Sequence, residues 1–176
     1  KYDINLGTPR YYDINNDGFL SLNDFIEYSK GASVAPASIF VHLTGITKDG
    51  SDYTEPAFDV REAATPCAMF SYLVHIIRDF QKDQFNHLNY FADELVSKHG
   101  LTRNELRDIA HGSPVTRGFR DLIKEYYELA GEYRNKTVKI IEELKPKMEP
   151  RYQLSLEIIF SLYLMVFERI DVEKGN

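Results

Sequence analysis

Apolar residues recur through residues 117–144 at alternating steps of four and three. The stripe consists of Phe119, Ile123, Tyr126, Ala130, Tyr133, Thr137, Ile140 and Leu144. This spacing keeps the side chains on one side of an α-helix and predicts a helix of roughly 28 residues packed along another helix. A chain with such a helix needs partners of similar length, which favours a helical bundle.

Two further segments predict long helices. Residues 60–85 carry apolar positions near helical spacing, and residues 154–170 are apolar on nearly every side, which predicts a central, buried helix. No segment shows convincing strand alternation. The predicted fold class is therefore all-α: a single domain over residues 1–176, with antiparallel helices enclosing a core or a cavity and residues 1–21 as a loop-rich lead-in.

Shorter signals complete this prediction. Residues 22–28 have a short helical pattern, and Thr102 with Glu105 forms a capping box that opens another helix. Residues 31–45 suit close helix packing with a break near Pro36, and residues 47–56 form a polar loop.

Composition narrows the function classes. Twenty-one basic and 27 acidic residues give a net charge of −6, so the chain as a whole does not attract nucleic acid or an anionic membrane. The single cysteine, Cys67, excludes an internal disulfide and fits a cytoplasmic location. The most apolar late stretch is about ten residues long, against roughly 20 needed to span a bilayer.

Residues 75–84 place charges in an arrangement that helix stability alone does not favour. Asp79 and Asp83 are four residues apart, which puts both carboxylates on one helix face about 6 Å apart, beside the like-charged pair Arg78 and Lys82. Two such carboxylates can hold Mg²⁺ while water and ligand phosphate fill its other positions. Spacing alone also allows a solvated charged face with Asp79 paired to Lys82.

The same face continues into aromatic and apolar residues. Tyr72, His75 and Ile76 precede the aspartates near helical spacing, and Tyr90 follows them. A solvent-exposed face would not carry this series. A site for a long apolar molecule with a charged head would require it.

Three segments together resemble one known family. The first is Arg78-Asp79-x-x-x-Asp83 followed by Tyr90-Phe91, the second is Tyr28-Ser29-Lys30-Gly31-Ala32-Ser33, and the third is Leu162-Tyr163 with the apolar-acidic residues 164–171. They resemble the head-to-head trans-prenyltransferases, the squalene and phytoene synthases, in which the second segment has the similar pattern Tyr-Cys-x-x-Ala-Gly. Their order and spacing match the family from about Leu22 to Asp171. Together they are more specific than Asp-x-x-x-Asp alone.

The resemblance implies an isoprenoid synthase fold around a central cavity and an enzyme that joins two farnesyl or geranylgeranyl diphosphates head to head. The expected products resemble squalene, dehydrosqualene or phytoene, with Mg²⁺ as cofactor and NADPH only if squalene is formed. The resemblance implies three roles: Asp79 and Asp83 bind Mg²⁺; Arg78, Lys82 and His75 bind the diphosphate; Tyr28, Tyr90 and Tyr163 are catalytic. Lipid substrates and products make peripheral membrane contact plausible.

The chain departs from the family in two ways. Tyr72 and His75 stand where the family usually has Gln and Asn, which leaves the usual polar contacts to the diphosphate in doubt. The family's first Asp-rich motif lies well upstream of the segment matching Tyr28, and this sequence starts at Lys1 rather than Met. We therefore expect a preceding segment, with further helices, to supply the other half of the metal site. Whether this chain alone is active stays open.

A second motif supports a different hypothesis. Asp13, Asn15, Asp17 and Asp24 fit an EF-hand-like calcium loop, with Gly18 at its sixth position. Only one such loop is present, and Asp24 is shorter than the usual Glu at position 12. A helix-capping turn is therefore favoured over Ca²⁺ binding. The alternative function is a non-catalytic helical calcium-binding or interaction module.

Overall fold

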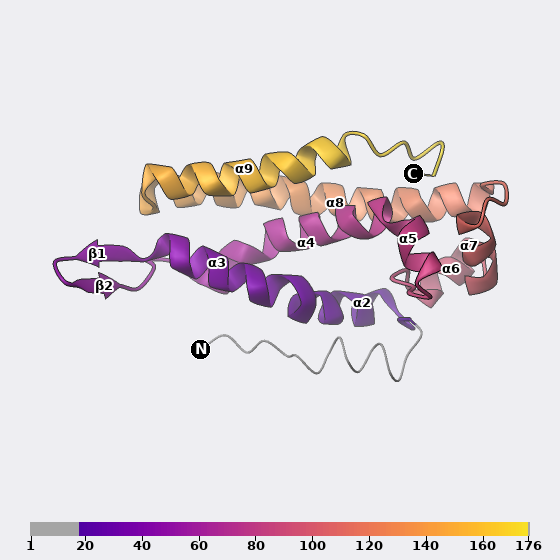
Figure 1. The fold of residues 1–176 in the computed structure, drawn as a ribbon, viewed down its shortest axis with the longest axis horizontal. Coiled ribbons are helices and arrows are strands. Elements are labelled where there is room, and N and C mark those ends of the chain that lie inside the picture. Colours follow the sequence, from indigo (N-terminus) through magenta and orange to yellow (C-terminus); the bar gives the residue numbers. More distant parts are fainter. Residues whose placement is uncertain (1–17, 176) are drawn as a thin grey trace.

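Long helices run back and forth along one axis of the molecule (Figure 1). The computed structural model describes residues 18–175. Its helices are α2 (Leu22–Ser29), the π-helical turn η1 (Lys30–Val34), α3 (Ala35–Gly45), α4 (Val60–Arg78), α5 (Phe80–Phe85), α6 (Asp93–Lys98), α7 (Arg103–Ala110), α8 (Arg117–Leu144), the 3₁₀ turn η2 (Lys145–Lys147) and α9 (Pro150–Phe167). The predicted all-α class is confirmed.

The heptad-like stripe forms helix α8, which spans 28 residues. It begins where the Thr116 hydroxyl accepts a hydrogen bond from the Phe119 N–H, a standard helix cap. Six of the eight predicted stripe positions are buried, and α4 packs along this face more extensively than any other element does. Helices α4 and α8 are therefore the central antiparallel pair.

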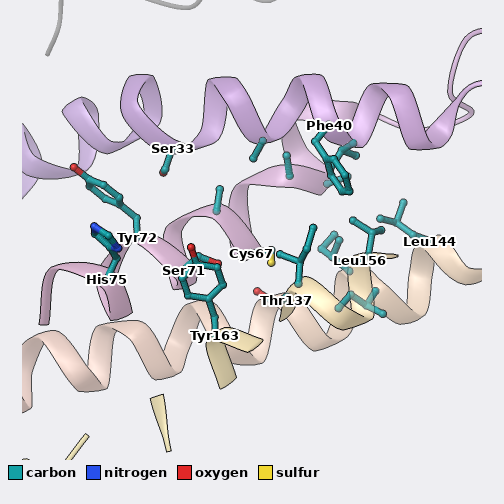
Figure 2. A pocket seen from close by; sticks show the side chains of 18 residues that line it. Ser33, Phe40, Cys67, Ser71, Tyr72, His75, Thr137, Leu144, Leu156 and Tyr163 are labelled. Carbon is teal, nitrogen blue, oxygen red and sulfur yellow. The ribbon is translucent and has the colours of Figure 1, made fainter. Parts of the chain in front are cut away.

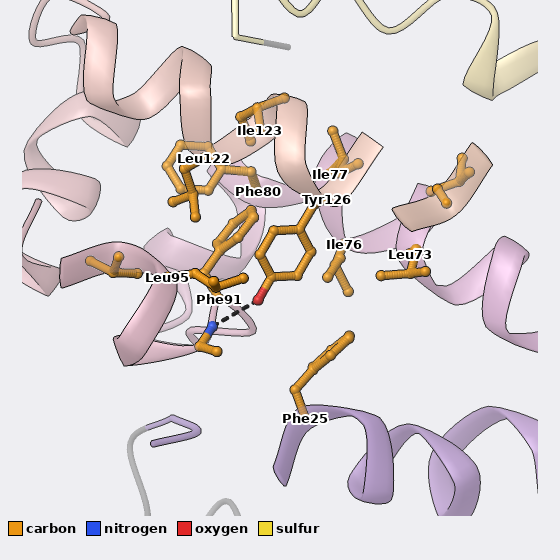
Figure 3. Packing of buried hydrophobic residues seen from close by; sticks show 14 of the residues in the cluster. Phe25, Leu73, Ile76, Ile77, Phe80, Phe91, Leu95, Leu122, Ile123 and Tyr126 are labelled. Carbon is orange, nitrogen blue, oxygen red and sulfur yellow. Dashed lines mark hydrogen bonds between the residues drawn. The ribbon is translucent and has the colours of Figure 1, made fainter. Parts of the chain in front are cut away.

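The end of the bundle beside α5, α6 and α7 is organised around Tyr126 of α8 (Figure 3). Its ring lies 4.8 Å from the Phe91 ring and 5.9 Å from the Phe25 ring, centroid to centroid. Its hydroxyl accepts a 2.8 Å hydrogen bond from the backbone N–H of Ala92, and burial raises the pKa of this phenol. One side chain thus joins α2, α8 and the segment leading into α6.

Helix α9 is not central, and this prediction is wrong. It lies at the edge of the bundle beside α8 (Figure 1). Only Phe160 and Phe167 are buried, whereas Leu154, Ile158, Leu162 and Met165 are each at least half exposed. A helix sequence that is apolar on every side shows that the helix could bury much surface. It does not show which sides pack against other helices.

The predicted helix over residues 60–85 is divided in two. Helix α4 ends at Arg78, Asp79 leaves helical geometry with φ −93° and ψ 6°, and α5 starts at Phe80. The hydrogen bonds continue across the break, because the Asp79 N–H donates to His75 O and the Asp83 N–H to Asp79 O. Asp is a weak helix former, and neighbouring side chains hold the Asp79 carboxylate. The break between the two helices therefore falls at the predicted metal site.

Two local features also differ from expectation. The predicted loop over residues 47–56 contains a small antiparallel hairpin, β1 (Thr47–Asp49) and β2 (Asp52–Thr54), whose turn uses Gly50 at φ 63°. Both strands are three residues long and fully exposed, so no alternation could reveal them. The break expected near Pro36 lies one turn earlier, in η1, and Pro36 sits in the first turn of α3.

The longest apolar helices do not qualify as membrane spans. Among the residues that the structure describes, no helix combines the length and apolar composition needed to cross a bilayer.

Candidate active site

A cavity of about 440 Å³ lies between α3, α4, α8 and α9 (Figure 2). Tyr72 and His75 lie at one end, and Phe40, Leu144 and Leu156 lie at the other. Small side chains make room between these ends, chiefly Ala37, Ala63, Ala64, Cys67, Ala68 and Ser71. The cavity is therefore long, mostly apolar and polar at one end, which suits an apolar chain with a polar head.

The predicted charged residues gather beside the polar end. Arg78 donates to both carboxylate oxygens of Asp79, from Nε to Oδ1 at 2.7 Å and from Nη2 to Oδ2 at 3.1 Å. His75 lies one turn before Asp79, and its Nε2 is 3.2 Å from Asp79 Oδ2. Asp79 therefore pairs with Arg78 and His75 rather than with Lys82.

The contacts of His75 assign its tautomer. Its Nδ1 lies 2.7 Å from Arg78 Nη2, and a guanidinium can only donate, so Nδ1 accepts. Nε2 then carries the proton and lies beside Asp79 Oδ2. His75, which stands where the family usually has Asn, thus has its N–H group next to Asp79.

The two aspartates have opposite electrostatic environments. The hydrogen bond from Arg78 lowers the pKa of the Asp79 carboxyl. Burial, followed by the negative charge of Asp79, raises the pKa of the Asp83 carboxyl. Within residues 18–175 the Asp83 carboxylate has no hydrogen-bond or ion-pair partner. Lys82 is exposed but close enough for its charge to lower the pKa of both carboxyls.

This arrangement fits part of a magnesium site. Mg²⁺ is commonly held by one or two carboxylates together with water and substrate phosphate, and Asp83 is free of protein partners in the described part of the chain. The same part of the chain contains no group of three or more His, Cys, Asp or Glu side chains placed to hold a metal ion. Asp79 and Asp83 can therefore contribute two ligands, and the others must come from elsewhere.

The predicted catalytic tyrosines fall into two groups. Tyr28 and Tyr90 belong to one aromatic cluster, with ring centroids 6.4 Å apart. Tyr163 of α9 lines the cavity instead, and it lies near Arg78. All three lie at the same end of the bundle as the aspartates.

Helix α4 places one of the two predicted neighbours of His75 away from the site. The spacing puts Ile76 on the site face, but Ile76 is buried in the core, 1% exposed. Tyr72 stays on the site face, where it lines the cavity beside His75. The other cavity residues come from η1, α3, α4, α8 and α9, and the convergence of these elements has no signal in the local sequence.

The calcium-loop prediction stays a prediction. Asp13, Asn15 and Asp17 lie outside the described residues. The Asp24 carboxylate accepts hydrogen bonds from the Ser21 N–H at 3.0 Å and the Ser21 hydroxyl at 2.7 Å, as a capping box at the start of α2. Asp24 therefore has a structural role in capping.

Comparison with known proteins shows the family and the fold. The family model for squalene/phytoene synthase matches residues 5–176, and comparison with curated proteins finds no match. The crystal structure of squalene synthase HpnC from Alicyclobacillus acidocaldarius is similar in fold, with a TM-score of 0.77 and 13% identity. The match covers 97% of this chain and 58% of that one. Because the family model matches nearly the whole length of the chain, the chain belongs to the squalene/phytoene synthase family.

Proposed function

We propose that this chain binds a prenyl diphosphate and ionises it, as part of a head-to-head prenyltransferase. The observation that carries the proposal is one apolar cavity whose polar end adjoins Asp79, Asp83, Arg78 and His75. An amphiphile with a hydrocarbon tail and an anionic head matches both ends of this site. Family membership supplies the class of reaction.

Cavity size is compatible with a prenyl tail. Its volume of about 440 Å³ is many times the roughly 30 Å³ that a molecule of liquid water occupies, so many carbons of a hydrocarbon chain fit. Farnesyl and geranylgeranyl diphosphate are therefore both proposed as substrates.

The side chains divide the chemistry between them. Ionisation breaks the allylic C–O bond, with both electrons leaving on the diphosphate, so positive charge at that end lowers the barrier. Arg78 and Lys82 supply such charge, while Asp79 and Asp83 would hold Mg²⁺, which neutralises charge on the leaving diphosphate. The apolar wall keeps water away from the carbocation left in the cavity. The proposal requires NADPH only if the product is squalene.

We also propose that a second acidic segment completes the metal site. Two carboxylates leave most positions around a divalent ion unfilled, and the described residues supply no third ligand. Carboxylates from such a segment would face Asp79 and Asp83 across the bound diphosphate.

Turnover tests this proposal. The chain, together with the segment proposed to complete its metal site, is incubated with farnesyl or geranylgeranyl diphosphate and Mg²⁺, and released diphosphate and C30 or C40 products are measured. We expect Mg²⁺-dependent release of diphosphate that disappears in an Asp79→Asn, Asp83→Asn double variant. Asp121→Asn is the matched control, because Asp121 is a half-exposed carboxylate of α8 paired to Arg117. Equal activity in the double variant would exclude the assigned metal ligands.

A further inference from the structure

Tyr72 links the aromatic cluster to the cavity. Its ring centroid lies 6.5 Å from that of Tyr28, 6.3 Å from that of Tyr90 and 6.1 Å from that of Phe25. Tyr72 lines the cavity, whereas these three neighbours are not among the lining residues. Of the cluster, Tyr72 is thus the ring that a bound molecule would touch.

The neighbours hold this ring in a fixed orientation. Phe25 is fully buried and stacks on Tyr72 with an interplanar angle of 12°, while Tyr90 meets it edge to face at 79°. Tyr28 is 8% exposed and tilted at 43° to Tyr72. A ring clamped by such contacts needs no reorganisation when charge develops beside it, which is the condition for efficient electrostatic stabilisation.

The position of Tyr72 along α4 is also suitable. Tyr72, His75 and Asp79 follow one another at steps of three and four, so they lie on one helix face. Figure 2 shows Tyr72 beside His75 at the polar end of the cavity, with Tyr163 next along it. The carbon that loses the diphosphate would lie at this end, where the lining includes the rings of Tyr72 and Tyr163 but no carboxylate.

We propose that Tyr72 is a catalytic residue whose ring faces the allylic cation, and that Tyr28 and Tyr90 act through it as positioning residues. This inference rests on the proposed function. It assigns the contact with the cation to a position that the family pattern usually gives to Gln. The attraction between a cation and an aromatic face is worth roughly 2- to 30-fold in affinity, and more when the pair is shielded from water.

A binding comparison tests this inference without turnover. Two probes are titrated in the presence of Mg²⁺ and inorganic diphosphate: a prenyl ammonium, in which nitrogen replaces the cationic carbon, and its uncharged carbon isostere. The ratio of the two affinities isolates recognition of charge, because both probes fill the same volume. We expect Tyr72→Phe to keep the wild-type ratio and Tyr72→Leu to lower it roughly 2- to 30-fold.

Two further variants keep the result interpretable. Pentafluorophenylalanine at position 72 keeps the shape of a phenyl ring while reversing its charge distribution, so it must lower the ratio even if Tyr72→Leu fails to fold. Tyr163→Leu tests the other ring of the lining. An unchanged ratio with pentafluorophenylalanine at position 72, or a loss confined to Tyr163→Leu, overturns the inference while leaving the proposed function intact. If neither probe binds the wild-type chain, the proposed function fails, and the inference fails with it.

Discussion

Filling the cavity at Cys67 should stabilise the protein and weaken ligand binding at the same time. Figure 2 shows Cys67 beside Thr137, between the polar end at Tyr72 and the apolar end at Leu156. Burial raises the pKa of its thiol, so the side chain is a neutral group in an apolar wall. Cys67→Leu adds two carbon groups at this point.

The magnitudes follow from the burial of those groups. At about 0.8 kcal/mol for each buried CH₂, two added groups stabilise the ligand-free fold by up to about 1.6 kcal/mol. A prenyl tail bound in the cavity would lie along this wall, so the same groups displace about two of its carbons. The expected loss of affinity is roughly 15-fold.

Urea denaturation and calorimetric titration with farnesyl thiolodiphosphate measure the two effects. Cys67→Ala is the matched control, because it leaves the cavity open and should retain binding. Undiminished affinity in a stabilised Cys67→Leu variant would refute the placement of the tail. Lower stability would instead show that the wall cannot accept the added groups, since overpacking costs about 1–3 kcal/mol.

Three other substitutions test separate parts of the structure. Tyr126→Phe removes the acceptor of the buried Ala92 N–H, so the free energy of unfolding should fall by about 1–3 kcal/mol; no change in urea denaturation would contradict that hydrogen bond. Arg78→Gln removes the cause of the lowered Asp79 pKa. The stability from this pair is present above the unfolded-state pKa of Asp79 and is lost as pH falls through its lower folded-state pKa. In metal-free acid titrations, the wild type should therefore lose more stability than Arg78→Gln. Parallel curves of stability against pH for the two proteins would contradict the pair. Leu162→Glu should change stability by no more than about 0.5 kcal/mol, because Leu162 is 58% exposed; a larger loss by the same assay would show that this face of α9 is covered.

The sequence predicts an element when its apolar residues lie on one side only or when its cap is local. Helix α8 could be predicted because Phe119 to Leu144 define a single buried face, and the helix from Arg103 to Ala110 because its capping box is local. Helix α9 could not be placed, because residues such as Leu154 and Ile158 are apolar on sides that have no neighbour in the described structure. Its position depends on the packing of other helices.

Part of the candidate site could likewise be predicted from the sequence, and part could not. Asp79, Asp83, His75 and Arg78 lie within nine residues, so helical spacing brings them together. The pairing of Arg78 with Asp79 depends on the break between α4 and α5, which spacing does not reveal. The cavity forms only where α3, α4, α8 and α9 meet.

The structure of the complex with farnesyl thiolodiphosphate and Mg²⁺ tests the central claim most directly. We predict the tail in the cavity between α3 and α9, ending near Phe40, with the diphosphate and metal at Asp79 and Asp83. A tail bound outside this cavity, or a diphosphate held away from both aspartates, would contradict the account.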